Sequence, residues 1–397
     1  MTDQISLAVD VRDLDLRAAH GDLRQSRLNG SIRVDHGDGR QMIAVNLRQK
    51  DMQIEGSAEV SAESIKFDRL TARAGGARLL ASGSIRRDET FGYAVDGTVE
   101  NFDPARFGDF PQARLNGTLR AQGELLPDWN AAVQFQVARS QLKAIALSGD
   151  GKARVTRSHV QDADIRIDYG GNKLTLKGNF GSAGDVLDFS LDAPRLDRLE
   201  ETANGQLQLS GTVAGTRARP SIKARLQARK LGFGEFHVDE AQADIALTQA
   251  DDPAIRVQAL LRQPGRGGLA VDSAEATIDG TLGSHVIDLS VAAPELHLVS
   301  RLEGGWGWSQ QSWSGTLVQL ENVKGDYPFR MNRAASLELA PDHVHLGATA
   351  VTFSIAELEL AETRIGNDGL RTTGAIKGVR AARVLALMDK PPVIDST

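Results

Sequence analysis

Apolar and polar residues alternate along most of the chain. Between residues 115 and 125 every odd position is apolar or glycine and every even position is polar. Successive side chains of a β-strand point to opposite faces, so this pattern predicts strands with one apolar and one polar face. Buried parallel strands would instead read as continuous apolar runs. The same alternation occurs in segments 133–137, 163–169, 174–180, 207–213, 222–228 and 255–261.

Turn signals separate these segments at the short spacing that is typical of an all-β chain. Glycine-rich examples are residues 35–39, 148–151 and 170–172. Helical pattern is scarce, and three of the four candidates carry proline near their start, where its missing N–H costs nothing. The four predicted helical segments are Asp103–Phe107, Pro194–Glu200, Pro294–Val299 and Arg380–Leu387.

An internal repeat runs through the chain. The motif RLNGSIR at 27–33 returns as RLNGTLR at 114–120, and Asn204-Gly205 begins a third, weaker copy. We interpret these Asn-Gly pairs as repeat turns. Regular repeats predict a stack in which each unit contacts its neighbours. We therefore expect one continuous structure over 1–397, built of units at about 1–107, 108–200, 201–299 and 300–397.

A sheet with one apolar face must bury that face. It can pack on a second sheet or curl into a trough. Glycines in phase with the apolar side favour the trough, because strand glycines mark bends, although they also mark bulges. These glycines are Gly117, Gly123, Gly211 and Gly280. The predicted fold class is all-β: an elongated, repetitive β-groove, a taco-like curved sheet of mostly antiparallel strands with short helical plugs.

A long apolar trough predicts a binding function. A chain-like amphiphile fits it, since each buried CH₂ contributes about 0.8 kcal/mol and a sixteen-carbon tail on the order of 10 kcal/mol. A charge placed in the trough should block such a ligand. The predicted lipid-binding residues are Leu115, Leu119, Phe135, Ile165, Ile167, Leu174, Leu176, Phe180, Leu207, Leu209, Val213, Ile222 and Leu226.

Composition narrows the alternatives. The 397 residues carry a net charge of −6, which argues against a nucleic-acid binder. Cysteine is absent, which excludes disulfides and thiolate chemistry. The apolar content of 41% and charged content of 25% are ordinary for a globular chain. Neither a transmembrane helix nor a signal peptide is visible.

No strong catalytic constellation is present, so we expect neither an enzyme nor a cofactor or metal. His343 and His345 share one strand face but lack a third ligand, and we interpret them as solvent-facing. Three of the four tryptophans, Trp306, Trp308 and Trp313, cluster together. They form either a local cap or a gate that contacts lipid, because tryptophan combines an apolar body with a polar N–H.

Several motifs resemble one family. They are Asn101–Phe107 followed by Leu115–Leu119, Gly205–Val213 followed by Pro220–Ala224, and Trp313–Leu317. Together they are similar to the TamB family of the translocation and assembly module, within the AsmA-like superfamily of Gram-negative bacteria. The resemblance implies a periplasmic β-groove that carries phospholipid to the outer membrane and works with an Omp85-type (TamA-like) barrel.

The resemblance covers most of the chain as a middle periplasmic segment. It implies that the full-length protein is anchored in the inner membrane and meets the barrel through parts that this sequence lacks. The predicted function is a hydrophobic conduit that binds acyl chains and passively carries phospholipid between the membranes. The alternative is a scaffold or chaperone that assembles outer-membrane proteins by β-augmentation. A solenoid adhesin would favour aromatic ladders, and aromatics are few.

Overall fold

The computed structural model describes residues 5–18, 21–267, 269–307, 311–325, 328–366 and 369–379. These residues contain 29 β-strands and three short 3₁₀ turns. They fall into two compact units, which are described separately. The first unit holds residues 1–201 and 212–218, and the second holds residues 202–211 and 219–397.

Thirteen strands and three 3₁₀ turns make up the first unit. The turns are η1 (Leu16–Ala18), η2 (Pro104–Arg106) and η3 (Leu196–Arg198). The strands are β1 (Ile5–Leu14), β2 (Leu28–Gly37), β3 (Arg40–Gln49), β4 (Met52–Val60), β5 (Ser64–Ala74), β6 (Ala77–Arg86), β7 (Tyr93–Phe102), β8 (Ala113–Glu124), β9 (Asn130–Leu142), β10 (Ile145–Thr156), β11 (Val160–Tyr169), β12 (Asn172–Phe180) and β13 (Val186–Ala193).

The remaining strands form the second unit, to which β14 contributes its first part. They are β14 (Ala203–Gly215), β15 (Pro220–Phe233), β16 (Phe236–Leu247), β17 (Ala254–Arg262), β18 (Gly265–Arg266), β19 (Leu269–Ala270), β20 (Ser273–Thr281), β21 (His285–Ala293), β22 (Leu296–Gly307), β23 (Ser312–Asn322), β24 (Phe329–Met331), β25 (Ala335–Leu339), β26 (His343–Leu346), β27 (Thr349–Phe353), β28 (Glu357–Gly366) and β29 (Gly369–Lys377).

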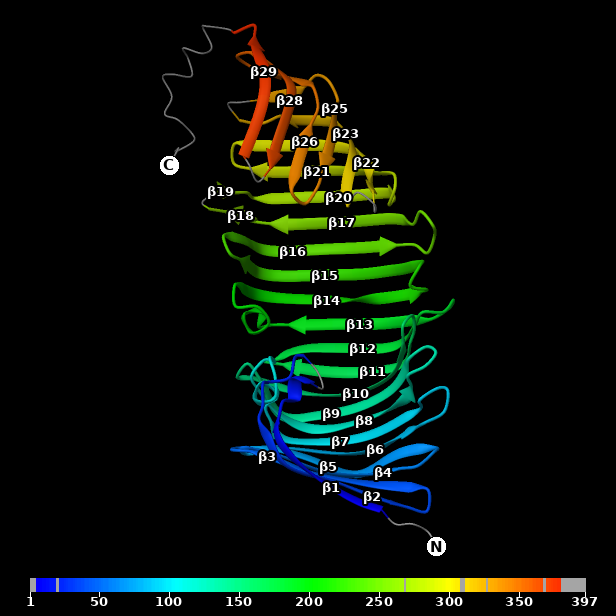
Figure 1. The fold of residues 1–397 in the computed structure, drawn as a ribbon. Coiled ribbons are helices and arrows are strands. Elements are labelled where there is room, and N and C mark those ends of the chain that lie inside the picture. The colour runs from blue at the N-terminus through cyan, green and yellow to red at the C-terminus, as the bar shows by residue number, and fades with distance from the viewer. Residues whose placement is uncertain are drawn as a thin grey trace. The chain divides into compact units, whose positions relative to one another are not determined.

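Within each unit most strands pair antiparallel with the strands that precede and follow them in the chain. The first unit runs without interruption from β1 to β13, and Figure 1 shows its strands side by side and bent. Tight hairpins explain much of this order, because a short connection places the next strand beside the last; the longer β1–β2 and β7–β8 connections contain η1 and η2. The predicted fold class is confirmed: the protein is all-β, with elongated, curved antiparallel sheets.

Two of the predicted helical segments contain single 3₁₀ turns. In η2, Pro104 occupies the first position and Asp103 Oδ1 accepts a hydrogen bond from the Ala105 N–H at 3.3 Å. The prediction of a helix at Pro294–Val299 is wrong, because Leu296 already begins strand β22 and pairs with Ala293. The alternation of apolar and polar residues therefore decided the local structure here, and the proline at 294 does not start a helix. The segment Arg380–Leu387 lies outside the described residues.

The sequence predicts that the Asn-Gly pairs of the repeat form turns. This prediction is wrong, because all three pairs lie inside strands. The Asn116 side chain accepts a hydrogen bond from the Asn101 N–H at 2.8 Å, and Asn101 itself has a φ of +46°. Asn29 does the same for Asp13, at 3.1 Å and a φ of +54°. At Gly117 a Cβ would meet the carbonyl of the neighbouring Gln136. The motif thus marks a β-bulge, where an extra residue must be accommodated and only glycine fits beside it.

The apolar face as candidate functional site

Strand register lines up apolar residues across the whole first unit. Directly paired residues of neighbouring strands point to the same face, so each row of partners forms a stripe on the sheet. One such row crosses β1 to β13 without a polar member. It runs Val9, Ile32, Val45, Gly56, Leu70, Ala81, Gly97, Leu119, Phe135, Gly151, Ile165, Leu176 and Phe189.

A second apolar row runs beside the first, two residues along each strand. It consists of Val11, Gly30, Leu47, Ile54, Ala72, Leu79, Val99, Gly117, Val137, Gly149, Ile167, Leu174 and Leu191. We call the surface made by these two rows the apolar face of the first unit. With strands about 4.8 Å apart, it extends roughly 60 Å across the thirteen strands.

Most of this face is half-buried, and parts of it are exposed. Leu119 is 46% exposed, and its row partners Phe135, Ile165 and Leu176 are only half-buried. Burial is deeper at one rim, where Phe107 and Leu16, beside the 3₁₀ turns, pack with Leu28, Leu47 and Met52. The short 3₁₀ turns therefore cover part of one rim and leave the centre of the face uncovered.

The opposite face of the first unit is polar and charged. Arg120 pairs with Asp96 at 2.6 Å, and Arg166 with Asp150 at 3.2 Å. These side chains are more than half exposed, and such surface pairs contribute about 0–1 kcal/mol each. They keep this face solvated and mark it as the outside of the sheet.

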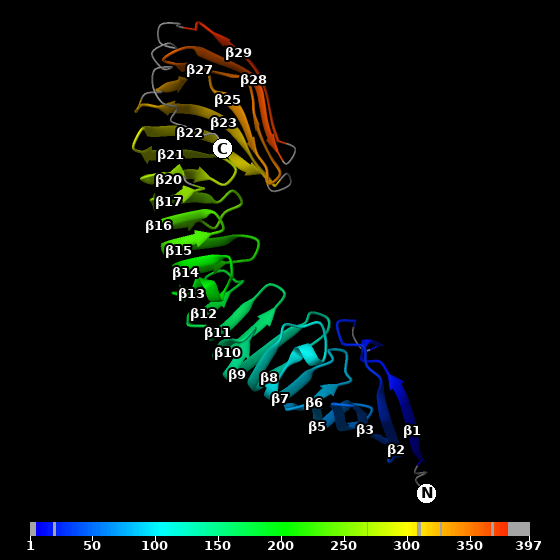
Figure 2. The same ribbon diagram turned by 90° about the vertical axis from the view of Figure 1, so that its left-hand side faces the viewer.

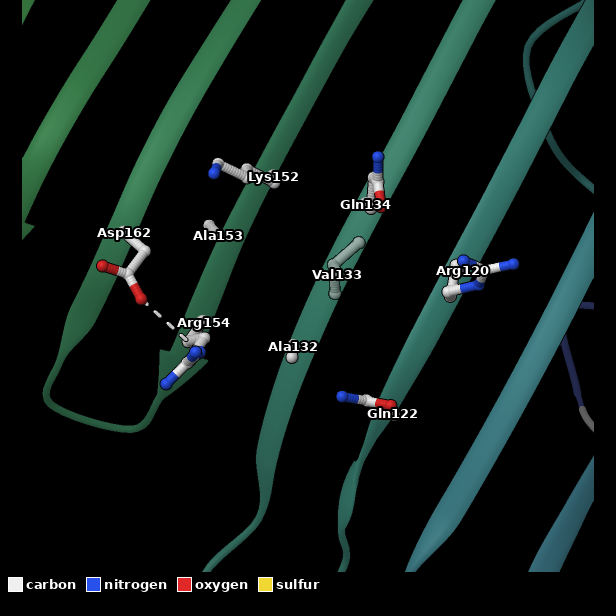
Figure 3. Close-up of a pocket in the computed structure, with 9 residues that line it drawn as sticks. All are labelled: Arg120, Gln122, Ala132, Val133, Gln134, Lys152, Ala153, Arg154 and Asp162. Carbon is white, nitrogen blue, oxygen red and sulfur yellow. Dashed lines mark ion pairs between the residues drawn. The ribbon is translucent and has the colours of Figure 1, made fainter.

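A hollow of about 450 Å³ lies among these polar side chains (Figure 3). The Arg154–Asp162 ion pair, 3.5 Å long, closes one side of the hollow, and Figure 3 shows Arg120, Gln134 and Lys152 on successive strands. Its lining offers neither a serine, a histidine nor a buried acid that could act in catalysis. The lining residues are Arg120, Gln122, Ala132, Val133, Gln134, Lys152, Ala153, Arg154 and Asp162.

The structure brings six predicted binding residues together on the apolar face of the first unit. Three direct pairs link them across the strands: Leu119 with Phe135, Ile165 with Leu176, and Ile167 with Leu174. Residues such as Val45 and Leu79 belong to the same rows, although the sequence analysis did not single them out. Their own strands alternate in the same way, so the pattern that found Leu119 could have found them.

The other predicted residues lie at the borders of the face or in later strands. Leu115 pairs with Phe102 beyond a bulge, and Phe180 pairs with Val160 at the far end of β12. Leu207, Leu209 and Val213 are half-buried in β14. Ile222 pairs with Leu247 and Leu226 with Ala243, both in the second unit, and the row of Leu226 ends at the polar Ser300.

Apolar rows also cross the second unit. One row consists of Ala224, Ile245, Val257, Ile278, Ile287, Leu302, Leu317 and Ala335. The row that Ile222 begins continues through Leu247, Ile255, Gly280, His285, Gly304, Gly315, Leu337 and Leu346. A histidine and several glycines thus stand where bulky apolar residues stand elsewhere.

Trp313 fills the space left by these glycines. Its indole carbons lie 2.7 Å from where a Cβ would stand on Gly304 and on Gly315. Its Nε1–H donates to His285 Nε2 at 2.9 Å, and His285 Nδ1 bonds the Thr281 carbonyl at 2.8 Å. The imidazole is therefore neutral, with its proton on Nδ1, because Nε2 must accept.

A core covers this end of the second unit. Trp313 is only 5% exposed and packs with Leu302, Leu317 and Met331, which are also buried. Half-buried residues of β25 and β26, including Leu337 and Leu346, close over the cluster. Figure 2 shows the sheet curling at β23–β29. Trp306 packs against the same core, whereas Trp308 lies outside the described residues.

The shifted ionisable groups lie on turns and not on the apolar face. Hydrogen bonds from Arg17 lower the pKa of Asp15 to about 2. A hydrogen bond from Thr90 lowers the pKa of Asp88, and one from Thr281 does the same for Asp252. Each shift reflects a hydrogen bond at the exposed surface, so none indicates a catalytic acid or base.

The two histidines of β26 have carboxylate neighbours. His343 Nδ1 lies 2.8 Å from Asp342, and His345 Nε2 lies 2.9 Å from Glu362. Across the described part of the chain, no group of three or more histidine, aspartate or glutamate side chains has the geometry of a metal site. Over the same residues, no helix has the length and apolar character needed to cross a membrane.

These features define a class: an all-β protein whose antiparallel sheets present long apolar rows on one face and solvated charges on the other. A family model described as "TamB, N-terminal domain" matches residues 16–350. The chain therefore belongs to the TamB family, as its motifs had indicated. The expectation that it is a middle segment stays a prediction.

Membership of the TamB family indicates the general role of the protein. The family acts in the translocation and assembly module or in lipid transport, and it is not an enzyme family. It spans the periplasm and works in a module with an outer-membrane partner of the Omp85 type.

Proposed function

We propose that the apolar face of the first unit binds the acyl chains of phospholipids and lets them move along it between the inner and outer membranes. The single observation that carries the proposal is the pair of unbroken apolar rows across thirteen strands. A row without polar members has no step at which a sliding acyl chain would meet a desolvation barrier.

The energetics support this proposal. Each buried CH₂ contributes about 0.8 kcal/mol, so a sixteen-carbon chain on the face gains on the order of 10 kcal/mol. The many glycines and alanines of the rows, such as Gly97 and Gly151, leave shallow troughs between leucines rather than deep pockets. A uniform surface of this kind binds without selecting a headgroup, which suits passive transport of mixed phospholipids.

The wider arrangement belongs to the same proposal. The predicted repeats would extend one groove over 1–397, and the residues from Leu207 to Leu226 would carry it through β14 and β15. In the periplasm the full-length protein would be anchored in the inner membrane and deliver lipid beside a TamA-like barrel. Two successive sets, each of six strands and one 3₁₀ turn, support the proposed repeat of about 90 residues: β2–β7 with η2, and β8–β13 with η3.

Site-specific photocrosslinking in lipid-containing cells tests the binding face. The crosslinker is placed at Leu119, on the apolar face, or at its neighbour Thr118, on the polar face; both side chains are exposed. Phospholipid attached at Leu119 and not at Thr118 supports the proposal. Equal labelling at both positions, or none at Leu119 in folded protein, contradicts it.

A charge on the rows should block transport. Ile165→Asp and Leu176→Asp place a carboxylate at the centre of the face, whereas Thr175→Asp puts the same charge on the polar face of the same strand. We expect lipid occupancy, measured by native mass spectrometry, to fall in the first two variants and to persist in the third. Circular dichroism of all three variants controls for folding.

A scaffold function is the second candidate, and the edge of the first sheet favours it. Strand β1 pairs with β2 on one side, and its apolar residues Ile5, Leu7 and Val9 are between 44% and 61% exposed. An edge strand with unpaired backbone groups can accept a further strand by β-augmentation. This function would serve nascent outer-membrane strands.

The two functions respond differently to mutation. Proline at Ala8 removes a backbone donor from the edge strand and should weaken the binding of an outer-membrane β-hairpin peptide. Ile165→Asp should leave that binding unchanged if the edge is the site. Peptide binding that is lost in Ile165→Asp but kept in Ala8→Pro would exclude the scaffold reading.

A further inference from the structure

Two neighbouring hairpins of the first unit present large apolar side chains at their tips. The β6–β7 hairpin carries Phe91, and the β8–β9 hairpin carries Leu125, Leu126 and Trp129. All four are between 39% and 50% exposed. We call these four residues the rim patch. Both hairpin tips lie at the same ends of the strands, because Tyr93 at the start of β7 pairs with Gly123 near the end of β8.

The backbone holds the two tips together. The N–H groups of Leu125 and Leu126 both donate to the Thr90 carbonyl, at 3.1 and 3.0 Å. The Arg86 guanidinium joins the same loops, with Asp88 at 2.9 Å and Glu124 at 3.4 Å. The rim patch is therefore one ordered surface built from two hairpins.

Neither packing nor backbone preference accounts for the apolar residues there. Phe91 has a φ of +48°, a region that costs a bulky residue strain and that glycine or asparagine would occupy more easily. Its ring, like the side chains of Leu125 and Leu126, stays substantially in water. Exposed apolar residues that gather at one place mark an interaction surface.

The composition of the patch fits a bilayer interface. Leucine, phenylalanine and tryptophan are the residues that enter the boundary between headgroups and acyl chains, where the indole N–H stays hydrated. The charged residues of the two tips are Arg86, Arg87, Asp88, Glu89, Glu124 and Asp128, and Arg154 lines a hollow with Arg86 and Glu124. The three cations and four carboxylates leave a net negative charge that an anionic surface would repel, whereas zwitterionic headgroups offer both a phosphate and an ammonium.

We propose that the rim patch inserts into the surface of a zwitterionic phospholipid bilayer. The strands behind the tips lead onto the apolar side of the sheet through the paired residues Tyr93, Gly123 and Ala131. A bilayer held at this rim would lie beside the apolar face. The contact goes beyond the binding of single acyl chains, and it stands whether or not the face carries lipid.

Vesicle flotation with the full chain tests the contact. The vesicles are phosphatidylcholine alone or mixed in equal parts with phosphatidylglycerol. We expect binding to phosphatidylcholine, weaker binding to the mixture, and a loss of about tenfold or more in the double variant Leu125→Ser/Leu126→Ser. Phe110→Ser is the matched control, because Phe110 is comparably exposed on the β7–β8 loop at the other edge.

The depth to which Trp129 enters the bilayer is measured with phosphatidylcholine brominated on its acyl chains, because bromine quenches the fluorescence of a nearby tryptophan. Quenching should occur in the wild-type chain and be lost in Trp129→Phe, which keeps its binding. Absence of flotation, equal flotation of the double variant, or stronger binding to the anionic mixture overturns the proposal; absence of flotation would assign the patch to a protein partner. Flotation without lipid crosslinked at Leu119 would refute the proposed function and leave this contact standing.

Discussion

The apolar rows of the two units arise from the same alternation in the sequence but differ in how deeply they are buried. In the first unit they stay partly exposed, and Leu119 is 46% exposed although its neighbours in the rows are all apolar. In the second unit the rows reach β22 and β23, where Leu302, Trp313 and Leu317 are buried under β25 and β26. The comparison teaches that alternation creates an apolar face, whereas packing by later strands decides whether that face is a surface or a core.

The difference has a functional meaning. An open face is expensive for folding, since it forgoes burial that the second unit obtains, and such exposure marks a binding surface. The covered end has the properties of a structural cap: buried side chains, a satisfied indole N–H and close contacts. Trp313 thus fills the space over Gly304 and Gly315, which favours a local cap over a lipid gate at this tryptophan.

The largest expected effect comes from removing the central side chain of the cap. Trp313→Ala should destabilise the second unit by about 3–5 kcal/mol, because a buried tryptophan leaves a cavity and lost contacts. Trp129→Ala, at an exposed tip, should cost under about 1 kcal/mol. Urea unfolding followed by circular dichroism measures both. Similar costs for the two variants would show that the cap is not a packed core.

A matched leucine pair sharpens the contrast. Leu317→Ala, in a buried row of the second unit, should cost about 2–4 kcal/mol, and Leu119→Ala, in an open row of the first, under about 1 kcal/mol. Thermal unfolding resolves the two values. If Leu119→Ala proves as costly as Leu317→Ala, the face of the first unit is covered in solution, and its assignment as an open binding surface fails.

The His285–Trp313 hydrogen bond should contribute less than the packing. His285→Leu keeps an apolar volume but leaves the buried indole N–H of Trp313 without its acceptor, at a cost of about 1–3 kcal/mol, whereas the Thr281 carbonyl keeps the Ser284 N–H as a donor. Chemical unfolding of this variant beside Trp313→Phe and the double variant gives the coupling between the two residues. Fully additive losses would mean that the hydrogen bond adds nothing to stability.

The smallest expected effect is a pH dependence at one end of the first unit. The pKa of Asp15 is lowered to about 2 by Arg17, from an ordinary 3.8. A lowered pKa favours the folded state above about pH 4, and this stabilisation disappears as the pH falls toward 2. Hydrogen exchange of η1 and its neighbours should therefore quicken over that range. In Asp15→Asn this acid-dependent change should be absent, and its persistence would assign it to another carboxylate.

Local pattern was enough to predict much of the candidate site. Each strand's alternation identified residues such as Ile165, Leu174 and Leu176, and the structure places them in adjacent rows. It was not enough for the ends of the strands. Leu115 follows the same alternation, yet a bulge between Val99 and Phe102 of β7 shifts its partner, and no periodic pattern shows such a shift.

Two other errors have the same physical cause, which is that one short motif fits two local structures. An Asn-Gly pair suits a tight turn and equally a bulge, since both need a side-chain acceptor and a residue without a Cβ. A proline followed by polar and apolar residues suits a helix start at 294, yet Leu296 and Leu298 alternate and find partners in Ala293 and Val291. Strand pairing in the tertiary structure decided for a bulge at the Asn-Gly pairs and for a strand after residue 294.

The sequence by itself determined the all-β class, the two-faced strands, the absence of cysteine chemistry and the family. These follow from the period of side chains along one strand, which needs no partner to be visible. Only the tertiary structure decided that the rows join across thirteen strands, that β25 and β26 pack against the core around Trp313, and that the hairpin tips carrying Phe91 and Trp129 lie at the same ends of the strands. Those features depend on which strands become neighbours and in what register, and register is set by contacts between residues far apart in the chain.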